Sequence, residues 1–197
     1  MNQSILNKSR RDKFTMVIDI PIALKKKIDQ VPSNDACGYN IKDLLNANSI
    51  QYSIFGTPVP RVSVAAIEAP YAGQVHRNTT FSRASYAPLT IGMSIDNRFF
   101  NYWLLWTWIN LWNDTKTAEF DPERPAIYDP SIKDYITSFT VFALDEYDNR
   151  LISFSYKNVI ITELSEIEFS YRNTEEICCT ATFVFDQMFV NLEQTNC

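Results

Sequence analysis

The residues from Tyr135 to Val190 contain four runs in which apolar and polar side chains alternate, and this alternation constrains the fold most. Successive side chains of a strand point to opposite faces, so each run predicts a half-buried antiparallel strand. The polar segment Asp145–Asn149 separates the first two runs and predicts a turn. The same-parity residues expected on one face of each strand are Thr140, Phe142 and Leu144; Ile152, Phe154 and Tyr156; Ile167, Phe169 and Tyr171; and Ile177, Cys179, Ala181, Phe183 and Phe185.

This stretch resembles the C-terminal half of tail tube proteins from contractile-tailed bacteriophages and related injection machines. In that family, a turn opened by leucine-aspartate and closed by asparagine precedes an aromatic strand. A leucine-serine step follows, and a strand with alternating threonines and aromatics ending in aspartate closes the domain. The residues at the matching places are Leu144, Asp145, Asn149, Leu164, Ser165 and the strand Thr180–Asp186.

The resemblance implies a mainly β fold, a β-sandwich or flattened barrel of antiparallel strands with one flanking α-helix. In that family, subunits form a hexameric ring whose strands join between subunits, and the rings stack into a tube. The implied role is a structural virion component of a phage tail, assembled in the host cytoplasm, with genomic DNA passing through the lumen. The implied partners are sheath, hub, portal-side or baseplate proteins. A tail hub or adaptor ring protein of a short-tailed phage is an alternative with the same fold.

Residues 98–113 form the one long helical pattern, and Asp96 or Asn97 can cap its start. Its polar positions fill only a narrow arc near Thr107 and Asn110. A helix that is apolar around most of its girth must be covered on more than one side. Its own sheet can cover one side, and a second element or another subunit must cover the other. The residues expected to pack the helix against the sheet or a neighbouring subunit are Trp103, Trp106 and Trp108.

The remaining patterns predict shorter elements and one long hairpin. Residues 61–79 predict the hairpin, with strands at Arg61–Glu68 and Gln74–Thr79. Tyr71, Val75 and His76 on this hairpin are expected to contact an adjacent ring. Further strands are expected at Lys13–Ile20, Ser49–Phe55 and Pro88–Asp96, and short helices at Ile22–Asp29 and Ile41–Ala47.

The length of 197 residues predicts one domain, over residues 13–197, preceded by a flexible polar arm over residues 1–12. Residues 115–133 contain three prolines and no periodicity, which predicts a long loop that is functional or ordered by a partner. The longest apolar stretch is too short and too interrupted to cross a bilayer, so a soluble protein without a membrane span is expected.

No pattern of catalytic or metal-binding residues stands out. His76 has no carboxylate or cysteine at useful spacing, and the four cysteines lack a metal-site spacing. The net charge of −5 argues against a general nucleic-acid-binding surface. A mildly acidic wall would suit a conduit for DNA, although net charge more often serves solubility. We therefore expect no enzyme activity, no cofactor and no metal.

A carbohydrate-binding β-sandwich module is the alternative from another class, because the chain is rich in aromatic residues. In such a module, single aromatics on strand faces would stack on sugar rings, whereas here the tryptophans gather between Trp103 and Trp112 on one predicted helix. The mass in solution separates the two classes, since a sugar-binding module stays monomeric and a tube subunit forms rings or polymers.

Overall fold

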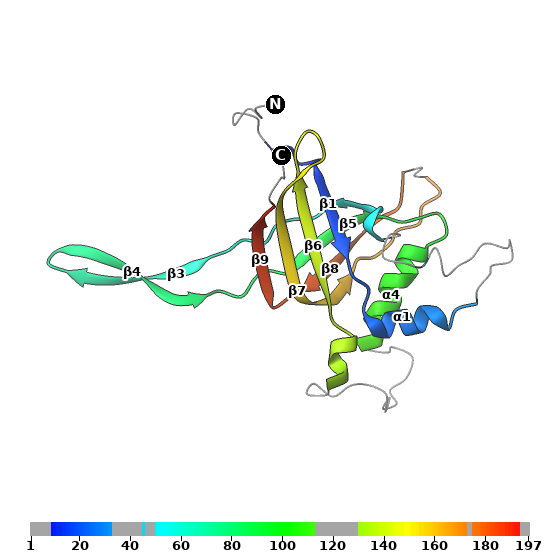
Figure 1. The fold of residues 1–197 in the computed structure, drawn as a ribbon, viewed down its shortest axis with the longest axis horizontal. Helices are drawn as coiled ribbons and strands as arrows, with labels where there is room; N and C mark the ends of the chain where they lie inside the picture. The colour runs from blue at the N-terminus through cyan, green and yellow to red at the C-terminus, as the bar shows by residue number, and fades with distance from the viewer. Residues whose placement is uncertain (1–8, 33–44, 46–49, 113–129, 173–174, 194–197) are drawn as a thin grey trace.

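The computed structural model describes residues 9–32, 45, 50–112, 130–172 and 175–193. Seven antiparallel strands curl into a nearly closed barrel, and two helices lie beside it (Figure 1). The strands follow the order β1-β6-β7-β8-β5-β2, and β9 also pairs with β7. Their bounds are β1 Phe14–Ile18, β2 Ile54–Gly56, β5 Leu89–Ser94, β6 Thr137–Leu144, β7 Arg150–Leu164, β8 Cys178–Val184 and β9 Gln187–Leu192.

Three helical segments and a separate hairpin complete the described fold. The helices are α1, Ile22–Asp29, and α4, Phe100–Trp112, and a 3-10 turn η1 spans Pro130–Asp134. The hairpin consists of β3, Val64–Tyr71, and β4, Gln74–Arg83. The mainly β fold predicted from the sequence is confirmed, with two helices at the barrel where the resemblance implied one.

Strand β7 belongs to two parts of the curled sheet. Its first half pairs with β6 on one side and β9 on the other, and its second half pairs with β8. At the junction, Asn158 has a positive φ of 56°, and its side-chain amide donates to Asp186 Oδ2 at 2.8 Å. This irregularity bends the strand and changes which alternate residues are buried. Before it, the even-numbered Tyr156 is buried, and after it, the odd-numbered Val159 and Ile161 are buried.

The core lies between the sheet and α4, where three aromatic rings meet. The ring of Trp108 lies 6.2 Å from that of Phe139 and 5.7 Å from that of Phe183, and the two phenylalanine rings are 4.9 Å apart. All three side chains are buried, and aromatic groups of this size bury the largest apolar areas in a domain. These three rings therefore join the helix to the sheet, together with the buried Leu104 and Leu105 of the same helix.

Several strand predictions need correction. The strand expected at Ile167–Tyr171 is absent: residues 165–170 have no regular structure, and Phe169 and Tyr171 are exposed. The chain instead continues β7 through Lys157–Leu164, where β8 supplies the ladder partner. On β6, Thr140 and Phe142 do share a face as expected, and the structure buries the opposite parity, Phe139 and Val141.

The N-terminal half shows smaller differences of the same kind. The strand expected at Ser49–Phe55 is reduced to β2, because Ile50 and Gln51 form a helical turn. The helix predicted at Ile22–Asp29 is present with those bounds. The predicted hairpin is present but begins and ends a few residues later, because β3 and β4 run from Val64 to Arg83. The helix expected at Ile41–Ala47 and most of the loop expected at 115–133 lie outside the described residues.

Asp96 caps α4, as one of the two predicted alternatives. Its Oδ1 accepts from the backbone N–H groups of Arg98 at 2.8 Å and Phe100 at 3.1 Å, and its Oδ2 accepts from Asn101 N at 2.8 Å. The buried Asn101 returns a bond, because its Oδ1 accepts from Asp96 N at 3.2 Å. The cap thus satisfies backbone donors that the first turn of a helix leaves unpaired.

Replacing Asp96 with alanine is expected to lower the free energy of unfolding by about 0.5–2 kcal/mol, because these donors lose their acceptor. Chemical denaturation followed by circular dichroism measures the change. Asn97→Ala is the matched control, because Asn97 is exposed and adjacent, and its effect should be close to zero. Equal losses in the two variants would contradict the assignment of the cap.

Within the described residues, no helix is long and apolar enough to cross a membrane.

Candidate assembly surfaces

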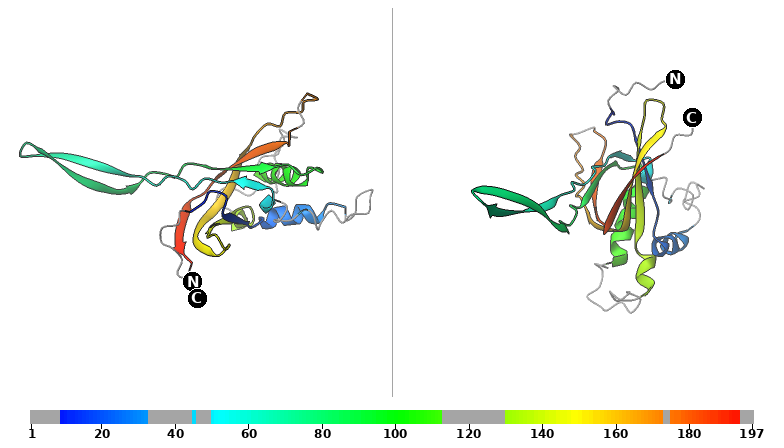
Figure 2. Two further views of the ribbon diagram at one scale, coloured as in Figure 1. Left: turned by 90° about the horizontal axis from the view of Figure 1, so that it is seen from above. Right: turned by 60° about the vertical axis from the view of Figure 1, so that its left-hand side comes forward.

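The β3–β4 hairpin extends away from the barrel, as the two perpendicular views agree (Figure 1 and Figure 2). Every residue of β3 is exposed, including Val64 and Ile67, and Tyr71 is 76% exposed. The turn residues Ala72 and Gly73 both have positive φ, 48° and 78°, which matches the twist of a tight two-residue hairpin turn. An isolated two-stranded ribbon is marginally stable in water, so this hairpin has the properties of a contact element.

The predicted hairpin contacts lie near its tip, on two different faces. Tyr71 pairs with Gln74, and His76 pairs with Ala69, so Tyr71 and His76 share one face. Val75 lies on the opposite face. That second face also carries the ion pair between Arg77 Nε and Glu68 Oε1, 2.8 Å apart. The tip therefore presents an aromatic face and a face on which charge is balanced.

Four strands of the barrel form a sheet with two edges that lack a strand partner in the described part of the chain. The order is β1-β6-β7-β9, and β1 and β9 are the outer members. On β9, Phe189 and Val190 are half exposed, and Leu192 is 82% exposed. An uncovered edge with apolar side chains is a template for pairing with another strand.

The structure separates the three predicted tryptophans of α4. Trp108 is 0% exposed and packs on the sheet of its own chain. It therefore packs the helix against the sheet, and none of its surface is open to another copy. Trp106 is 42% exposed, and Trp103 is half-buried. Trp106 and Trp103 are thus the tryptophans of this set that could contact a neighbour.

The sequence reasoning missed the role of Asn101. This side chain is fully buried and donates to Ser53 Oγ at 2.9 Å and to the Ser94 carbonyl at 2.8 Å. It therefore ties the first turn of α4 to the end of β5 and to the segment before β2. The sequence feature that could have indicated this role is an amide side chain within an otherwise apolar helical stretch.

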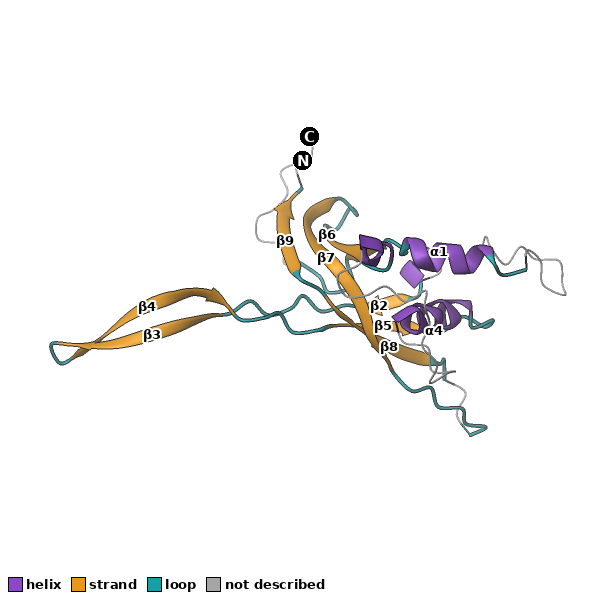
Figure 3. Cartoon of the chain, turned by 90° about the horizontal axis from the view of Figure 1, so that it is seen from below, coloured by secondary structure: helices purple, strands orange, loops and turns teal. Residues whose placement is uncertain are grey.

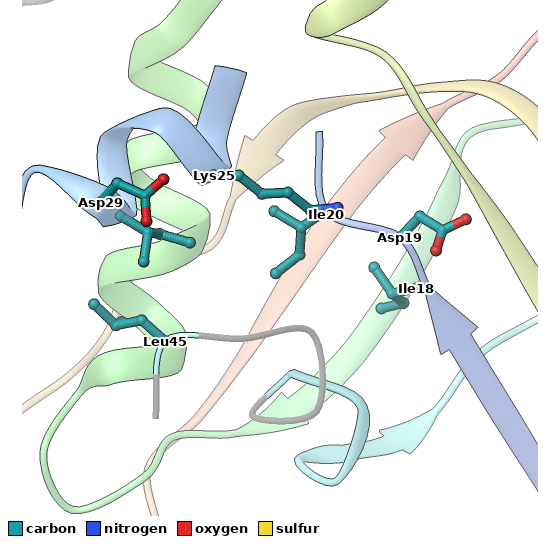
Figure 4. A pocket seen from close by; sticks show the side chains of 7 residues that line it. Ile18, Asp19, Ile20, Lys25, Asp29 and Leu45 are labelled. Atoms are coloured by element: carbon teal, nitrogen blue, oxygen red, sulfur yellow. The ribbon is translucent and has the colours of Figure 1, made fainter. Parts of the chain in front are cut away.

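A pocket of about 370 Å³ lies between α1 and the end of β1 (Figure 4). Its wall combines aliphatic side chains with one amine, Lys25, and two carboxylates, Asp19 and Asp29. Asp19 already accepts a hydrogen bond from Ser138 Oγ at 3.2 Å. This lining offers no pairing of a nucleophile with a base. Its remaining residues are Ile18, Ile20, Ile28 and Leu45.

A second, open groove of about 740 Å³ lies between the root of the hairpin and the β8–β9 junction, where Arg83, Tyr86 and Phe185 are among its lining residues.

The neighbouring cysteines Cys178 and Cys179 of β8 differ in exposure. Cys178 is exposed, whereas burial raises the pKa of the Cys179 thiol to about 11. A thiol with that pKa is not a nucleophile at neutral pH. Among the described residues, no three His, Cys, Asp or Glu side chains gather as metal ligands would.

No protein-family model and no curated protein sequence matches this chain. Solved structures of extracellular contractile injection systems do match. A chain of the PVC sheath–tube complex in the extended state has a TM-score of 0.56 at 11% identity, over 96% of this chain and 95% of that chain. A chain of the PVC sheath/tube terminator has a TM-score of 0.57 at 10% identity, over 95% and 99%.

A third similar structure is a chain of the cap that terminates the tube of the anti-feeding prophage. Its TM-score is 0.55 at 11% identity, over 98% of this chain and 97% of that chain. All three matches extend over nearly the full length of both chains. At such low identities, the likeness is one of fold.

Proposed function

We propose that this chain, whose fold is that of the contractile-tail tube proteins, is a structural subunit that forms rings and that these rings stack into a tube. The observation that carries the proposal is the four-stranded sheet β1-β6-β7-β9 with its two unpaired edges. When β9 of one copy pairs with β1 of the next, each contact is head-to-tail, and a head-to-tail contact that closes produces a ring. The hexamer implied by the resemblance is the ring we propose.

The hairpin supports the same assembly. It leaves the barrel on the side of β9, so it points toward the copy that would pair with that edge (Figure 1 and Figure 2). We propose that Tyr71, Val75 and His76 contact a neighbouring copy through the two faces of the tip, and that this contact extends to the adjacent ring. Trp103 and Trp106 of α4 provide a further apolar contact for a neighbour.

The tube would serve as the conduit of a contractile phage tail or a related injection system, and in a phage the cargo would be genomic DNA. The partners would be further copies and other tail proteins, such as those of the sheath and baseplate. A single terminal or adaptor ring is the second candidate, because a cap and a terminator are among the similar structures. Electron microscopy separates the two, since a tube subunit forms stacks and a terminal subunit forms single rings.

The general test is the state of the purified protein in solution. Negative-stain microscopy is expected to reveal rings or tubes, and sedimentation velocity is expected to show species much larger than 22.8 kDa. A monomer that persists at high concentration would contradict the proposal. Such a monomer, if it bound sugars, would favour the carbohydrate-binding alternative.

A proline at Val190 tests the edge contact directly. Glu193 N donates to Leu151 O at 3.0 Å, and bonded and non-bonded pairs alternate along antiparallel strands. Val190, three residues before Glu193 and opposite Phe154, therefore directs its N–H away from β7. Val190→Pro removes this outward donor, and edge strands tolerate proline. We expect a folded monomer that no longer forms rings, as measured by circular dichroism and sedimentation.

Two control variants show whether the loss of rings comes from the missing outward N–H. Val190→Thr keeps the N–H and the branched shape, so it should still form rings. Asn191→Pro removes a donor directed at β7, so it should lower the stability of the monomer itself. Rings of normal appearance from Val190→Pro would exclude β9 as the contact edge.

A further inference from the structure

The four-stranded sheet has one face on the core and one face that the helices leave uncovered. Met16, Phe139, Val141 and Tyr156 belong to the buried face. Figure 1 and Figure 3 show α1 and α4 beside and behind β6, β7 and β9, and no helix of the described residues lies in front of these strands. We call this second face the open face.

The strand register defines which side chains occupy the middle of the open face. Thr140 of β6 is opposite Ser155 of β7, and their hydroxyl oxygens are 3.3 Å apart. Ser153 of β7 is opposite Phe142 of β6 on one side and Asn191 of β9 on the other. The two central rows read Val17, Thr140, Ser155 and Phe189, and Thr15, Phe142, Ser153 and Asn191.

None of these eight side chains is charged. Four carry hydroxyls, one carries an amide and three are apolar. Ser153 is only 3% exposed and lies between the larger Phe142 and Asn191 on the neighbouring strands. These eight side chains therefore offer weak, neutral hydrogen-bonding groups and carry no charge of their own, although the Arg150 guanidinium lies over the ring of Phe142.

The ends of the open face carry charges of both signs. Beyond the central rows, Asp19 and Lys157 lie at one end. At the other end, Lys13 Nζ lies 2.7 Å from Asp148 Oδ1. Arg150 also lies there, with its guanidinium over the ring of Phe142, 4.2 Å from the ring centroid. Glu193, which follows β9, completes the set.

The net negative charge of the chain therefore comes from other residues. The segment 163–176, which runs from the end of β7 to just before β8, alone holds five glutamates and one arginine. It follows the half of β7 that pairs with β8, beyond the bend at Asn158. An acidic sequence thus coexists with a neutral open face.

We propose that the open face lines the hole of the ring and that the conduit does not hold or select its cargo by charge. This inference rests on the ring proposed above. In a ring closed through the β1 and β9 edges, one face of every sheet points inward, and the face that carries the core and helices is the bulkier and points outward. The inward wall is then neutral, instead of the acidic wall that the net charge suggests.

The neutral wall defines the class of cargo. A polyanion next to it neutralises no phosphates and releases no counterions, so it gains no electrostatic affinity. A polypeptide of mixed charge is likewise neither bound nor repelled electrostatically by this wall. Extended polymers of either sign, nucleic acid or polypeptide, can therefore move past this wall equally well.

Charge variants at Ser155 test the proposal with two fluorescent probes, a single-stranded DNA oligonucleotide and an oligolysine peptide. Wild-type rings are expected to retain neither probe at low salt. Ser155→Lys rings are expected to retain the DNA, with log affinity falling against log salt by about 0.7 per neutralised phosphate. Ser155→Asp rings are expected to retain the oligolysine peptide. Retention is measured by size-exclusion chromatography of rings with probe.

Thr90→Lys is the matched control, because Thr90 is an exposed threonine of β5, a strand outside the open face. A circular oligonucleotide of the same composition has no end to thread. It should bind Thr90→Lys rings as well as the linear form does, and Ser155→Lys rings much less. Thr15→Lys repeats the test from β1, should Ser155→Lys rings fail to form.

The outcomes separate this inference from the function on which it rests. Wild-type rings that retain oligolysine or DNA in a salt-dependent way would overturn the neutral wall alone. Ser155→Lys and Thr15→Lys rings that treat linear and circular DNA alike would place the open face outside the hole. An absence of wild-type rings would overturn the assembly proposal, and this inference with it.

Discussion

Trp108→Ala is expected to lower the free energy of unfolding by about 3–5 kcal/mol, the range for truncating a fully buried tryptophan or phenylalanine. Trp108 is 0% exposed, and its ring lies against Phe139 of β6 and Phe183 of β8. Its removal leaves a cavity between α4 and both parts of the sheet. A loss of this size is a large fraction of the stability of a typical domain, so partial unfolding at room temperature is expected.

Trp106→Ala provides the comparison within the same helix. Trp106 is 42% exposed, so its truncation should cost below about 1 kcal/mol in the monomer. Thermal and denaturant unfolding of the two variants measures the contrast. Similar losses in both would contradict the division of α4 into a core side and an outer side. The proposed contact role of Trp106 would appear separately, as weaker ring formation by a stable variant.

Shortening the hairpin is expected to abolish rings and tubes while leaving the barrel folded. The variant lacks residues 66–79 and joins Ala65 to Thr80 through Asn-Gly, a favoured two-residue hairpin turn. The residues of β3 that it removes are exposed, so the free energy of unfolding should change by less than about 1 kcal/mol. Sedimentation velocity and negative-stain microscopy measure the assembly, and circular dichroism measures the fold.

Point variants assign the effect to one face of the tip. Tyr71→Ser combined with His76→Ser alters one face, and Val75→Ser alters the other. The face that contacts a neighbour should weaken assembly when changed, whereas the other should not. Tubes of unchanged length from the shortened variant would show that the hairpin has no part in assembly.

The local signals of this sequence predicted the local structure well. Asp96 before an apolar helical stretch predicted the start of α4, and its carboxylate does cap that helix. The glycine and alanine between two exposed strands became the tip of the hairpin. The resemblance to contractile-tail tube proteins, based on residues after Tyr135, is confirmed as a likeness of fold over almost the whole chain.

The failures have a common physical origin, which is that strand limits depend on distant partners. Ile167, Phe169 and Tyr171 alternate as a strand would, yet no strand of the described residues pairs with them. Lys157–Leu164, in contrast, has β8 beside it. Alternation also cannot identify the buried parity when both parities contain large side chains, as on β6. Pairing is long-range information, and a single sequence holds little of it.

The assembly surfaces were predictable only in part. The helix is apolar on nearly all sides, so its pattern could not tell that Trp108 faces the core and Trp106 faces outward. The net charge gave no indication of where the charges lie, and the register was needed to show that the middle of the open face has none. The interface roles of Trp103, Trp106, Tyr71, Val75 and His76 stay predictions for the variants above.

The sharing of β7 between both parts of the barrel has a mechanical consequence. A pull on the β9 edge loads ladder bonds along the length of β7, and the same strand passes that load through the Asn158 bend to β8. Because one continuous strand joins the two parts, we expect the barrel to act as one stiff link. A column built from such links and driven endwise would yield first where one molecule meets the next.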